Sequence, residues 1–260
     1  MTMDITDFSL DVFSLEGKVA IVTGGNSGLG QAFALALAKA GADIFVPSIA
    51  DDDGTTRSLI EATGRRYEFL EIDITGPEAP ARVIQDTLER LGGLDVIVNS
   101  AGISKLAGVQ EFDREQWDPM VDLNLTAPFA LSQAAVEHFI AQGSGKIINI
   151  ASLFAFLGGQ SSPAYAATKH GIVGFTKAYS DELAGHGIQV NAIAPGYFAT
   201  ALTATTRADP DASRQILEHI PAGRWGEVSD LMGAAVFLAS KASGYVNGHV
   251  LTVDGGYLVR

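Results

Sequence analysis

Cysteine is absent from the 260 residues, which excludes disulfide bonds, cysteine nucleophiles and thiolate ligands for a metal. Basic residues are also few, since 17 lysines and arginines stand against 30 aspartates and glutamates and give a formal net charge of −13. Such a surface repels nucleic acids and anionic membranes, so we expect neither as a partner. An anionic substrate would need a basic group close to its site.

Long apolar segments are missing as well. No run approaches the roughly 18 residues that are needed to cross a bilayer. The N-terminal stretch MTMDITDFSLDVFSLEG is acidic and has neither the basic nor the apolar region of a signal peptide. A cytoplasmic location agrees with these features and with the lack of cysteine. The balance of 47% hydrophobic and 18% charged residues is instead typical of a globular domain.

Short apolar runs alternate with longer helical stretches along the chain. Apolar strands separated by helices indicate a single domain with one doubly wound parallel sheet of Rossmann-like α/β type and helices on both faces. Residues 197–226 interrupt the alternation and are a candidate substrate lid. Strands are expected at 18–23, 43–46, 67–72, 94–99, 146–150, 189–193 and 250–253, and helices at 28–40, 55–63, 77–91, 114–142 (with a break near Pro128), 164–185 and 228–239.

A glycine-rich turn, TGGNSGLG, follows the first expected strand and opens the first long helix. Glycine lets the backbone come close to a pyrophosphate, and the helix N-terminus supplies free N–H groups and a positive dipole. Its place at the start of a βαβ unit favours a dinucleotide site over a merely flexible turn. The residues expected to hold the cofactor there are Gly24, Asn26, Ser27, Gly28, Leu29 and Gly30.

The glycine spacing and several later segments resemble the short-chain dehydrogenase/reductase family over nearly the whole chain. Spaced motifs in one order are more specific than any single motif. The resemblance implies an oxidoreductase that transfers a hydride between a nicotinamide cofactor and a hydroxyl or carbonyl carbon. The segments are NSAG at 99–102, LNL around Asn124, Ser152 placed thirteen residues before Tyr165, YAATK ending at Lys169, PGYFAT at 195–200 and DGG at 254–256.

The residue types explain the chemistry. Tyr165 and Lys169 are four apart on an expected helix, so they share a face. Tyrosine has an ordinary pKa near 10, and a neighbouring ammonium is expected to lower the pKa of Tyr165 so that it can exchange a proton with the substrate. Ser152 would hydrogen-bond the substrate oxygen. The resemblance implies that Asn124 anchors a water for proton relay. Taken singly, each residue also has an ordinary structural explanation.

The cofactor type depends on the end of the second expected strand, where an acidic residue favours NAD and a basic one favours NADP. The family often has aspartate where this chain has Ser48. No lysine or arginine lies between Lys39 and Arg57, and residues 51–53 are aspartates that would repel a 2′-phosphate. We therefore expect NAD rather than NADP.

The resemblance extends the cofactor site beyond the glycine turn. Asp73 matches the family's adenine-contacting acid, with a local cap as the alternative. Thr200 matches the residue that bonds the nicotinamide carboxamide. The other expected cofactor contacts are Ser48, Ile74, Asn99, Ala101, Gly102, Tyr165, Lys169, Pro195 and Gly196.

Within the family the chain is most similar to the deoxygluconate and keto-deoxygluconate dehydrogenases, through segments such as EHFIAQGSGKIINIAS. A sugar acid needs a cation for its carboxylate. Lys105 is the candidate, with a solvated loop lysine as the alternative, while Gln160 and Tyr197 are candidate partners of sugar hydroxyls. Homotetramers are typical of the family, and residues 114–142 and 164–185 are expected at the interface.

Three alternatives stay open at this point. One is an NADPH-dependent reductase of 3-ketoacyl chains or other carbonyls, which the missing basic residues disfavour. Another is a sugar-alcohol or steroid dehydrogenase. From a different class, the fold also serves non-catalytic dinucleotide sensors, which would be expected to lose Tyr165, Lys169 or Ser152. No metal is expected in any of them.

Overall fold

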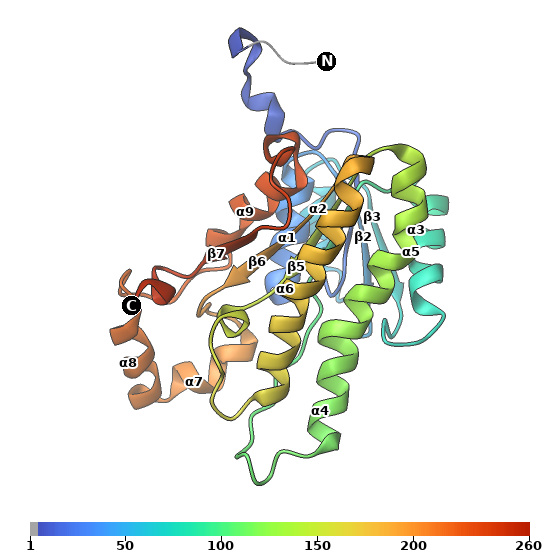
Figure 1. The fold of residues 1–260 in the computed structure, drawn as a ribbon. Helices are drawn as coiled ribbons and strands as arrows, with labels where there is room; N and C mark the ends of the chain where they lie inside the picture. Colours follow the sequence, from blue (N-terminus) through green and yellow to red (C-terminus); the bar gives the residue numbers. More distant parts are fainter. Residues whose placement is uncertain (1–4) are drawn as a thin grey trace.

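The computed structural model describes residues 5–260, in which seven parallel strands form one sheet (Figure 1). The strand order is β3-β2-β1-β4-β5-β6-β7, which confirms the predicted doubly wound parallel sheet. The strands are β1 (Val19–Val22), β2 (Asp43–Ser48), β3 (Tyr67–Glu71), β4 (Val96–Asn99), β5 (Gly145–Ile150), β6 (Ile188–Pro195) and β7 (Val250–Val253).

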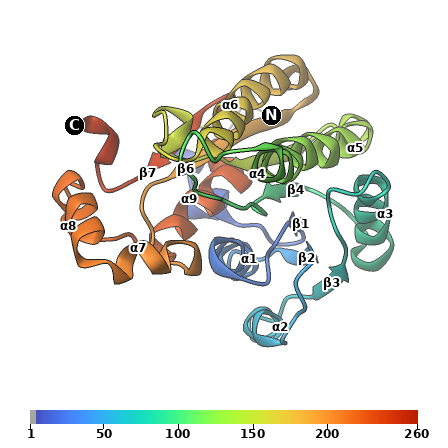
Figure 2. The ribbon, with the colours of Figure 1, turned by 90° about the horizontal axis from the view of Figure 1, so that it is seen from below.

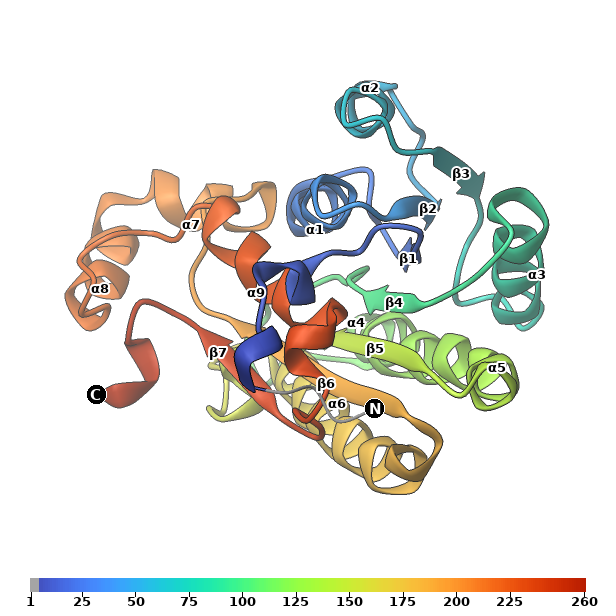
Figure 3. The same ribbon diagram turned by 90° about the horizontal axis from the view of Figure 1, so that it is seen from above.

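Helices cover both faces of this sheet (Figures 2 and 3). Helices α1, α2 and α9 lie on one side, and α3 to α6 lie on the other. In the described residues, no helix combines the length and the apolar composition that crossing a bilayer requires. The helix bounds are α1 (Gly28–Lys39), α2 (Thr55–Glu61), α3 (Ala79–Leu91), α4 (Arg114–Val121), α5 (Ala127–Gln142), α6 (Pro163–Leu183), α7 (Ala204–Ala208), α8 (Pro210–His219) and α9 (Ser229–Ala239).

The apolar strand residues explain the two helical layers. On one face Val22 belongs to the same buried cluster as Leu37 of α1 and Leu231 of α9. On the other face Ile21 belongs to the cluster that includes Phe139 of α5. Each fully buried side chain of this kind contributes about 1.5–3 kcal/mol. A strand that is buried on both faces must be apolar throughout, which is why the strands were visible in the sequence.

The long helical region expected at 114–142 is divided in the structure. Helix α4 and helix α5 are joined by a π-helical turn, η3 (Asp122–Thr126). Pro128 lies in the first turn of α5, where a helix has no partner for the missing N–H. The predicted break is therefore confirmed, and the π turn puts it just before the proline.

The candidate lid at 197–226 contains more regular structure than the sequence suggested. Helices α7 and α8 lie within it, at one end of the sheet (Figure 1). Asp209 caps α8 by accepting hydrogen bonds from Asp211 N and Ala212 N, and Pro210 opens the helix. These capping signals were present in the sequence, but the small polar residues around them concealed the helical pattern.

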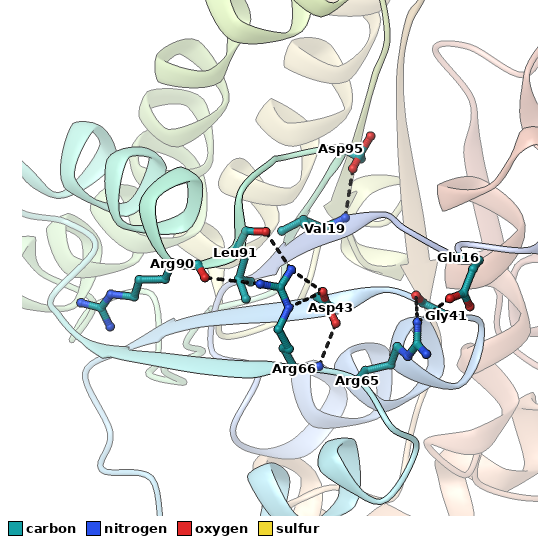
Figure 4. Close-up of polar contacts among 9 residues, drawn as sticks. All are labelled: Glu16, Val19, Gly41, Asp43, Arg65, Arg66, Arg90, Leu91 and Asp95. Carbon is teal, nitrogen blue, oxygen red and sulfur yellow. Dashed lines mark hydrogen bonds and ion pairs between the residues drawn. The ribbon is translucent and has the colours of Figure 1, made fainter.

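The amino ends of the strands are tied together by charged side chains (Figure 4). Arg66 donates to the Asp43 carboxylate (2.7 Å) and to the Leu91 carbonyl at the end of α3 (2.8 Å). Asp95, just before β4, accepts a hydrogen bond from Val19 N of β1 (3.0 Å). These contacts join β1, β2, α3 and the segment before β4 at this edge.

Candidate active site

A cleft of about 720 Å³ opens at the carboxyl ends of the strands. It spans the point between β1 and β4 where the strand order reverses, which is where doubly wound sheets bind ligands. Most of the predicted cofactor residues line this cleft. They are Gly24, Ser27, Gly28, Leu29, Gly30, Ser48, Asp73, Ile74, Ala101, Gly102, Tyr165, Lys169 and Thr200.

The glycine turn fits a pyrophosphate. Gly24 and Gly28 have positive φ angles of 63° and 52°, which glycine adopts without strain. A Cβ atom on Gly30 would lie 2.3 Å from the carbonyl oxygen of Gly24, so only glycine lets α1 begin this close to the turn. Ser27, the N-cap of α1, makes no capping hydrogen bond through its side chain. The first N–H groups of the helix therefore stay available to an anion.

Four predicted cofactor residues, Asn26, Asn99, Pro195 and Gly196, are not among the residues that line the cleft, and the first two instead brace its surroundings. The Nδ2 atom of Asn26 donates to the carbonyls of Ala50 (2.9 Å) and Asp51 (3.1 Å), which ties the glycine turn to the segment after β2. Asn99 is buried and donates to Oδ1 of Asn149 on β5 (2.8 Å). Direct contact of these two residues with a cofactor stays a prediction.

The adenosine end of the expected site is formed by Ser48 and Asp73. The Ser48 hydroxyl accepts a hydrogen bond from Ala50 N (3.2 Å) at the end of β2. The Asp73 carboxylate accepts from both the backbone N and the hydroxyl of Thr75, and these bonds lower the pKa of Asp73. Asp73 is thus a local cap and also part of the cleft wall.

Pro195 and Gly196 stand where β6 leaves the sheet, ahead of Thr200 in the cleft wall. A Cβ atom on Gly196 would lie 2.6 Å from the Cα atom of Asp254, so glycine allows the chain to pass close to the segment after β7. The two residues set the path of the chain into the candidate lid, and their contact with the cofactor stays a prediction.

Tyr165 and Lys169 lie together on α6, as their spacing predicted. The Nζ atom of Lys169 is 5.3 Å from the centre of the Tyr165 ring and donates to the carbonyl of Ile150 at the end of β5 (2.7 Å). Lys169 is only 5% exposed. Among the described residues it forms no ion pair with a carboxylate within 4.0 Å, which leaves its charge without an acidic partner.

Ser152 follows β5 and faces the same centre. It is the N-cap of a short 3₁₀ turn, η4 (Leu153–Ala155), and its hydroxyl oxygen accepts from Phe154 N (3.3 Å). Its side chain also hydrogen-bonds Tyr165, whose ring packs edge-on against Phe154 at 5.9 Å. A substrate oxygen bound at Ser152 would therefore also be beside the Tyr165 hydroxyl.

Burial dominates the electrostatics of Tyr165 and Lys169. It lowers the pKa of Lys169 from 10.5 to about 8 and raises the pKa of Tyr165, and hydrogen bonding to Ser152 only partly offsets the latter. The prediction of a lowered pKa for Tyr165 was wrong, because a buried phenolate loses its hydration and this loss raises the pKa. A ligand that brings positive charge into the cleft would favour the phenolate.

Asn124 is buried in the π turn η3. Its Oδ1 atom accepts from Ile103 N (2.9 Å), and its Nδ2 atom donates to the Ile103 carbonyl (2.8 Å). The side chain therefore fixes the segment that follows NSAG. Each polar atom of the side chain has one partner among the described residues, and a water bound at Asn124 stays a prediction. A π turn of this kind is frequent at functional sites.

None of the four predicted substrate contacts, Lys105, Ser152, Gln160 and Tyr197, is among the residues that line this cleft. Lys105 is exposed in the loop between β4 and α4, where its carbonyl accepts from the Ser162 hydroxyl (3.0 Å). Gln160 is exposed in the loop before α6. The Tyr197 ring packs against Trp225 at 5.7 Å and lines a second cavity of about 280 Å³.

The cleft also includes residues that were not predicted from the sequence. Pro119, Asp122 and Leu123 line it from α4 and η3, and Ala201 and Leu202 line it from the candidate lid. Apart from Asp122 their side chains are apolar, and only the neighbouring Asn124 and Thr200 motifs pointed to these segments. Among the described residues, no group of three or more acidic or histidine side chains could hold a metal ion.

Known proteins resemble this chain over nearly its whole length. The family described as Enoyl-(Acyl carrier protein) reductase matches residues 24–258. An uncharacterized oxidoreductase, YgcW, of Escherichia coli is 62% identical over 97% of each chain. The 2-dehydro-3-deoxy-D-gluconate 5-dehydrogenase of the same organism is 49% identical over 96% of this chain and 99% of its own.

Solved structures share the fold at comparable identity. A putative 2-deoxy-D-gluconate 3-dehydrogenase from Agrobacterium tumefaciens, with bound NADP, is 46% identical with a TM-score of 0.87 and covers 95% and 99% of the two chains. A gluconate 5-dehydrogenase from Burkholderia cenocepacia, in complex with NADP and tartrate, is 38% identical with a TM-score of 0.92 and covers 96% and 99%.

Proposed function

Because the chain belongs to the short-chain dehydrogenase/reductase family and is an NAD(P)-dependent oxidoreductase, we propose that it transfers a hydride between NAD(H) and a deoxy or keto sugar acid. The observation that carries the proposal is the cleft that is lined both by the glycine turn and by Tyr165 and Lys169, with the Ser152 side chain bonded to Tyr165. The relatives that act on 2-dehydro-3-deoxy-D-gluconate support the sugar-acid class.

Each residue of the site has a distinct role in proton transfer. When bound, the nicotinamide supplies the acceptor for the hydride that leaves the carbinol carbon. Tyr165, as the phenolate, takes the proton of the substrate hydroxyl, and the carbon–oxygen bond becomes a carbonyl. Ser152 hydrogen-bonds the same oxygen and holds it in place. Lys169 supplies the positive charge that favours the phenolate, and in the reverse direction Tyr165 returns the proton.

The preference for NAD rests on the charges after β2. Arg57, the only arginine near that segment within residues 5–260, stacks over the Tyr67 ring at 4.9 Å and pairs with Glu61. Hydrogen bonds from Thr55 lower the pKa of Asp53, which keeps this acid charged at neutral pH. A 2′-phosphate would thus meet anions here, whereas a ribose hydroxyl would not be repelled.

A charge added at the cleft edge tests this preference. Ile49 lines the cleft and is 70% exposed, so an arginine there can reach solvent and a nearby phosphate. Ile49→Arg is expected to raise kcat/KM for NADP relative to NAD about tenfold, as one new charge-assisted contact would. Ile49→Gln, of similar length without the charge, is the control. Equal ratios in the two variants would contradict the charge argument.

The substrate carboxylate is proposed to meet Lys105 at the rim, with Gln160 and Tyr197 near the sugar hydroxyls and residues 197–226 as a lid of the single domain. Lys105 is exposed, and its side chain forms no ion pair within residues 5–260. Lys105→Ala is expected to raise KM for a sugar acid and to leave KM for a neutral polyol unchanged. Equal changes for both substrates would remove Lys105 from the site.

A homotetramer in the cytoplasm is the proposed working form. Aromatic side chains gather on the outer side of α5 and α6, where Phe129 is 46% exposed and its ring lies 6.0 Å from that of Phe175. The Phe175 ring lies 4.5 Å from Tyr179. Exposed apolar clusters of this kind support subunit contact. Light scattering on Phe129→Glu should show a smaller assembly than the unchanged protein.

Absorbance at 340 nm tests the proposed function as a whole. The purified protein is mixed with NAD or NADP and with a panel of sugar acids, polyols and neutral alcohols. NAD reduction that depends on a deoxy sugar acid is the expected result. Turnover with neutral alcohols alone would contradict the substrate class, and turnover with NADP alone would contradict the cofactor preference. Dinucleotide binding without any turnover would favour a sensor.

A further inference from the structure

Arg207 differs from the other arginines of the candidate lid segment, 197–226. Arg214 pairs with Asp211 (2.8 Å), and Arg224 pairs with Asp230 (2.7 Å). Arg207, on α7, has no carboxylate within ion-pair distance among the described residues. Its charge is therefore the uncompensated one in this segment.

Neutral acceptors hold the Arg207 side chain against the wall of the cleft. Its Nη2 atom donates to the carbonyl of Thr200 (3.0 Å), and its Nε atom donates to Oγ1 of Thr203 (3.3 Å). Thr203 in turn donates to the Phe198 carbonyl (2.6 Å), which fixes the acceptor. Thr200 lines the cleft, so the guanidinium contacts a residue of the cleft wall without lining the cleft itself. Within residues 5–260, its Nη1 atom has no acceptor.

The acids that might have neutralised Arg207 are engaged elsewhere. Asp209 caps α8 through Asp211 N and Ala212 N. Asp211 and Glu218 both contact Arg214. In a chain with a net charge of −13, an arginine held by carbonyl and hydroxyl oxygens keeps its charge for a ligand. The planar guanidinium, with two edges of donors, matches carboxylate and phosphate oxygens.

We propose that Arg207 binds an anionic oxygen of a ligand at the lid end of the cleft. The inference rests on the proposed function, because that function brings two anions into the cleft, the carboxylate of the sugar acid and the diphosphate of the dinucleotide. Both offer paired oxygens to the free edge of the guanidinium. Among the described residues, Lys169 is the one cation that lines the cleft itself, and it is buried and already donates to the Ile150 carbonyl.

Three variants compare Arg207 with Arg214, an ion-paired arginine of the same segment. Arg207→Ala removes the cation, Arg207→Lys keeps a charge without the planar donors, and Arg214→Ala removes an ion-paired arginine of the same segment. Two quantities are measured in each variant: the KM for the sugar acid and the Kd for NADH alone, from nicotinamide fluorescence. Arg207→Ala is expected to raise one of them about 10- to 100-fold, as expected for a lost hydrogen bond to a charged group. Arg207→Lys should recover part of the loss.

The two measurements distinguish the sources of the anion. A raised KM with an unchanged Kd for NADH assigns Arg207 to the substrate carboxylate, and a raised Kd assigns it to the diphosphate. If Arg207→Ala matches Arg214→Ala in both quantities, the proposal is overturned. If the wild-type protein turns over no sugar acid, the proposed function fails instead. In that case an equal Kd for NADH in Arg207→Ala and Arg214→Ala would overturn the proposal for Arg207 as well.

Discussion

The amino ends of the strands form one edge of the sheet, here the amino edge, and their carboxyl ends form the other, the carboxyl edge. These two edges use charge in opposite ways. At the amino edge, cations pair with acids of the chain itself: Arg66 with Asp43 at 2.6 Å and Lys18 with Asp95 at 2.8 Å. At the carboxyl edge, Lys169 has no acidic partner among the described residues and is held by a carbonyl. Charge that is neutralised within the chain ties strands together, whereas charge that is left unpaired is available to ligands and to proton transfer.

Loss of the Tyr165 hydroxyl, at the carboxyl edge, should have the largest effect on turnover of all the changes. Tyr165→Phe removes the group that exchanges the proton, so kcat is expected to fall by about 10²- to 10⁴-fold. The Kd for NADH, measured by fluorescence, should stay within a factor of about three, well under the tenfold step that 1.4 kcal/mol represents. The exposed Tyr245 offers the matched control, because Tyr245→Phe removes a hydroxyl far from the cleft lining. Similar kcat values for the two variants would contradict the mechanism.

Two lysines, the buried Lys169 at the carboxyl edge and the half-buried Lys146 at the amino edge, allow a sharper comparison. Burial lowers the pKa of Lys169 and that of Lys146, at the start of β5, from 10.5 to about 8. Between pH 8 and 10.5 the unfolded chain binds more protons at these sites than the folded one, so the stability of the wild type rises with pH there. Below pH 8 the full penalty for the buried charge applies.

Replacing each lysine with methionine should therefore stabilise the fold at neutral pH. For Lys169→Met, the shift of the pKa from 10.5 to about 8 corresponds to about 3 kcal/mol in the free energy of unfolding at pH 7, and the gain should shrink as pH approaches 10.5. Lys146→Met should show a smaller gain of the same sign, because Lys146 is less buried and bonds Ser243 (3.1 Å).

Activity separates the two variants. Urea denaturation at pH 7 and at pH 10 measures the stability, and the 340 nm assay measures turnover. Lys169→Met should lose turnover while gaining stability, and Lys146→Met should keep turnover. Loss of turnover in both variants would remove the distinction between the edges.

The smallest expected effect belongs to the amino edge. Arg66→Ala removes the bonds to Asp43 and to the Leu91 carbonyl and is expected to cost about 1–2 kcal/mol of unfolding free energy, with kcat and KM unchanged. Arg114→Ala, at the exposed i,i+4 pair with Asp118, is the control and should cost less than about 0.5 kcal/mol. A change in kcat for Arg66→Ala would show that the amino edge also shapes the site.

The sequence was most informative where one chemical constraint acts locally. The apolar strands, the glycine turn and the spacing of Tyr165 and Lys169 follow from backbone periodicity and from the needs of a phosphate, so they were predictable. Helices α7 and α8 were missed because short helices among small polar residues have weak periodicity.

Other features depend on contacts between distant segments. Asn26 and Asn99 were assigned to the cofactor, yet their amides bond backbone and side chains that only the fold brings near. The raised pKa of Tyr165 depends on burial in the completed cleft. Arg207 gave no signal in the sequence, since its lack of an acidic partner is a property of the folded segment.

Isotope transfer tests the central claim most directly. NADH carrying deuterium on the nicotinamide carbon that donates the hydride is incubated with the protein and with the 5-keto form of a deoxy sugar acid, and the recovered acid is analysed by mass spectrometry and NMR. Hydride transfer at the carboxyl edge predicts one deuterium on the carbon that becomes the carbinol, and Tyr165→Phe should introduce it at least about 100-fold more slowly. An acid recovered from the unchanged protein without deuterium would contradict the account.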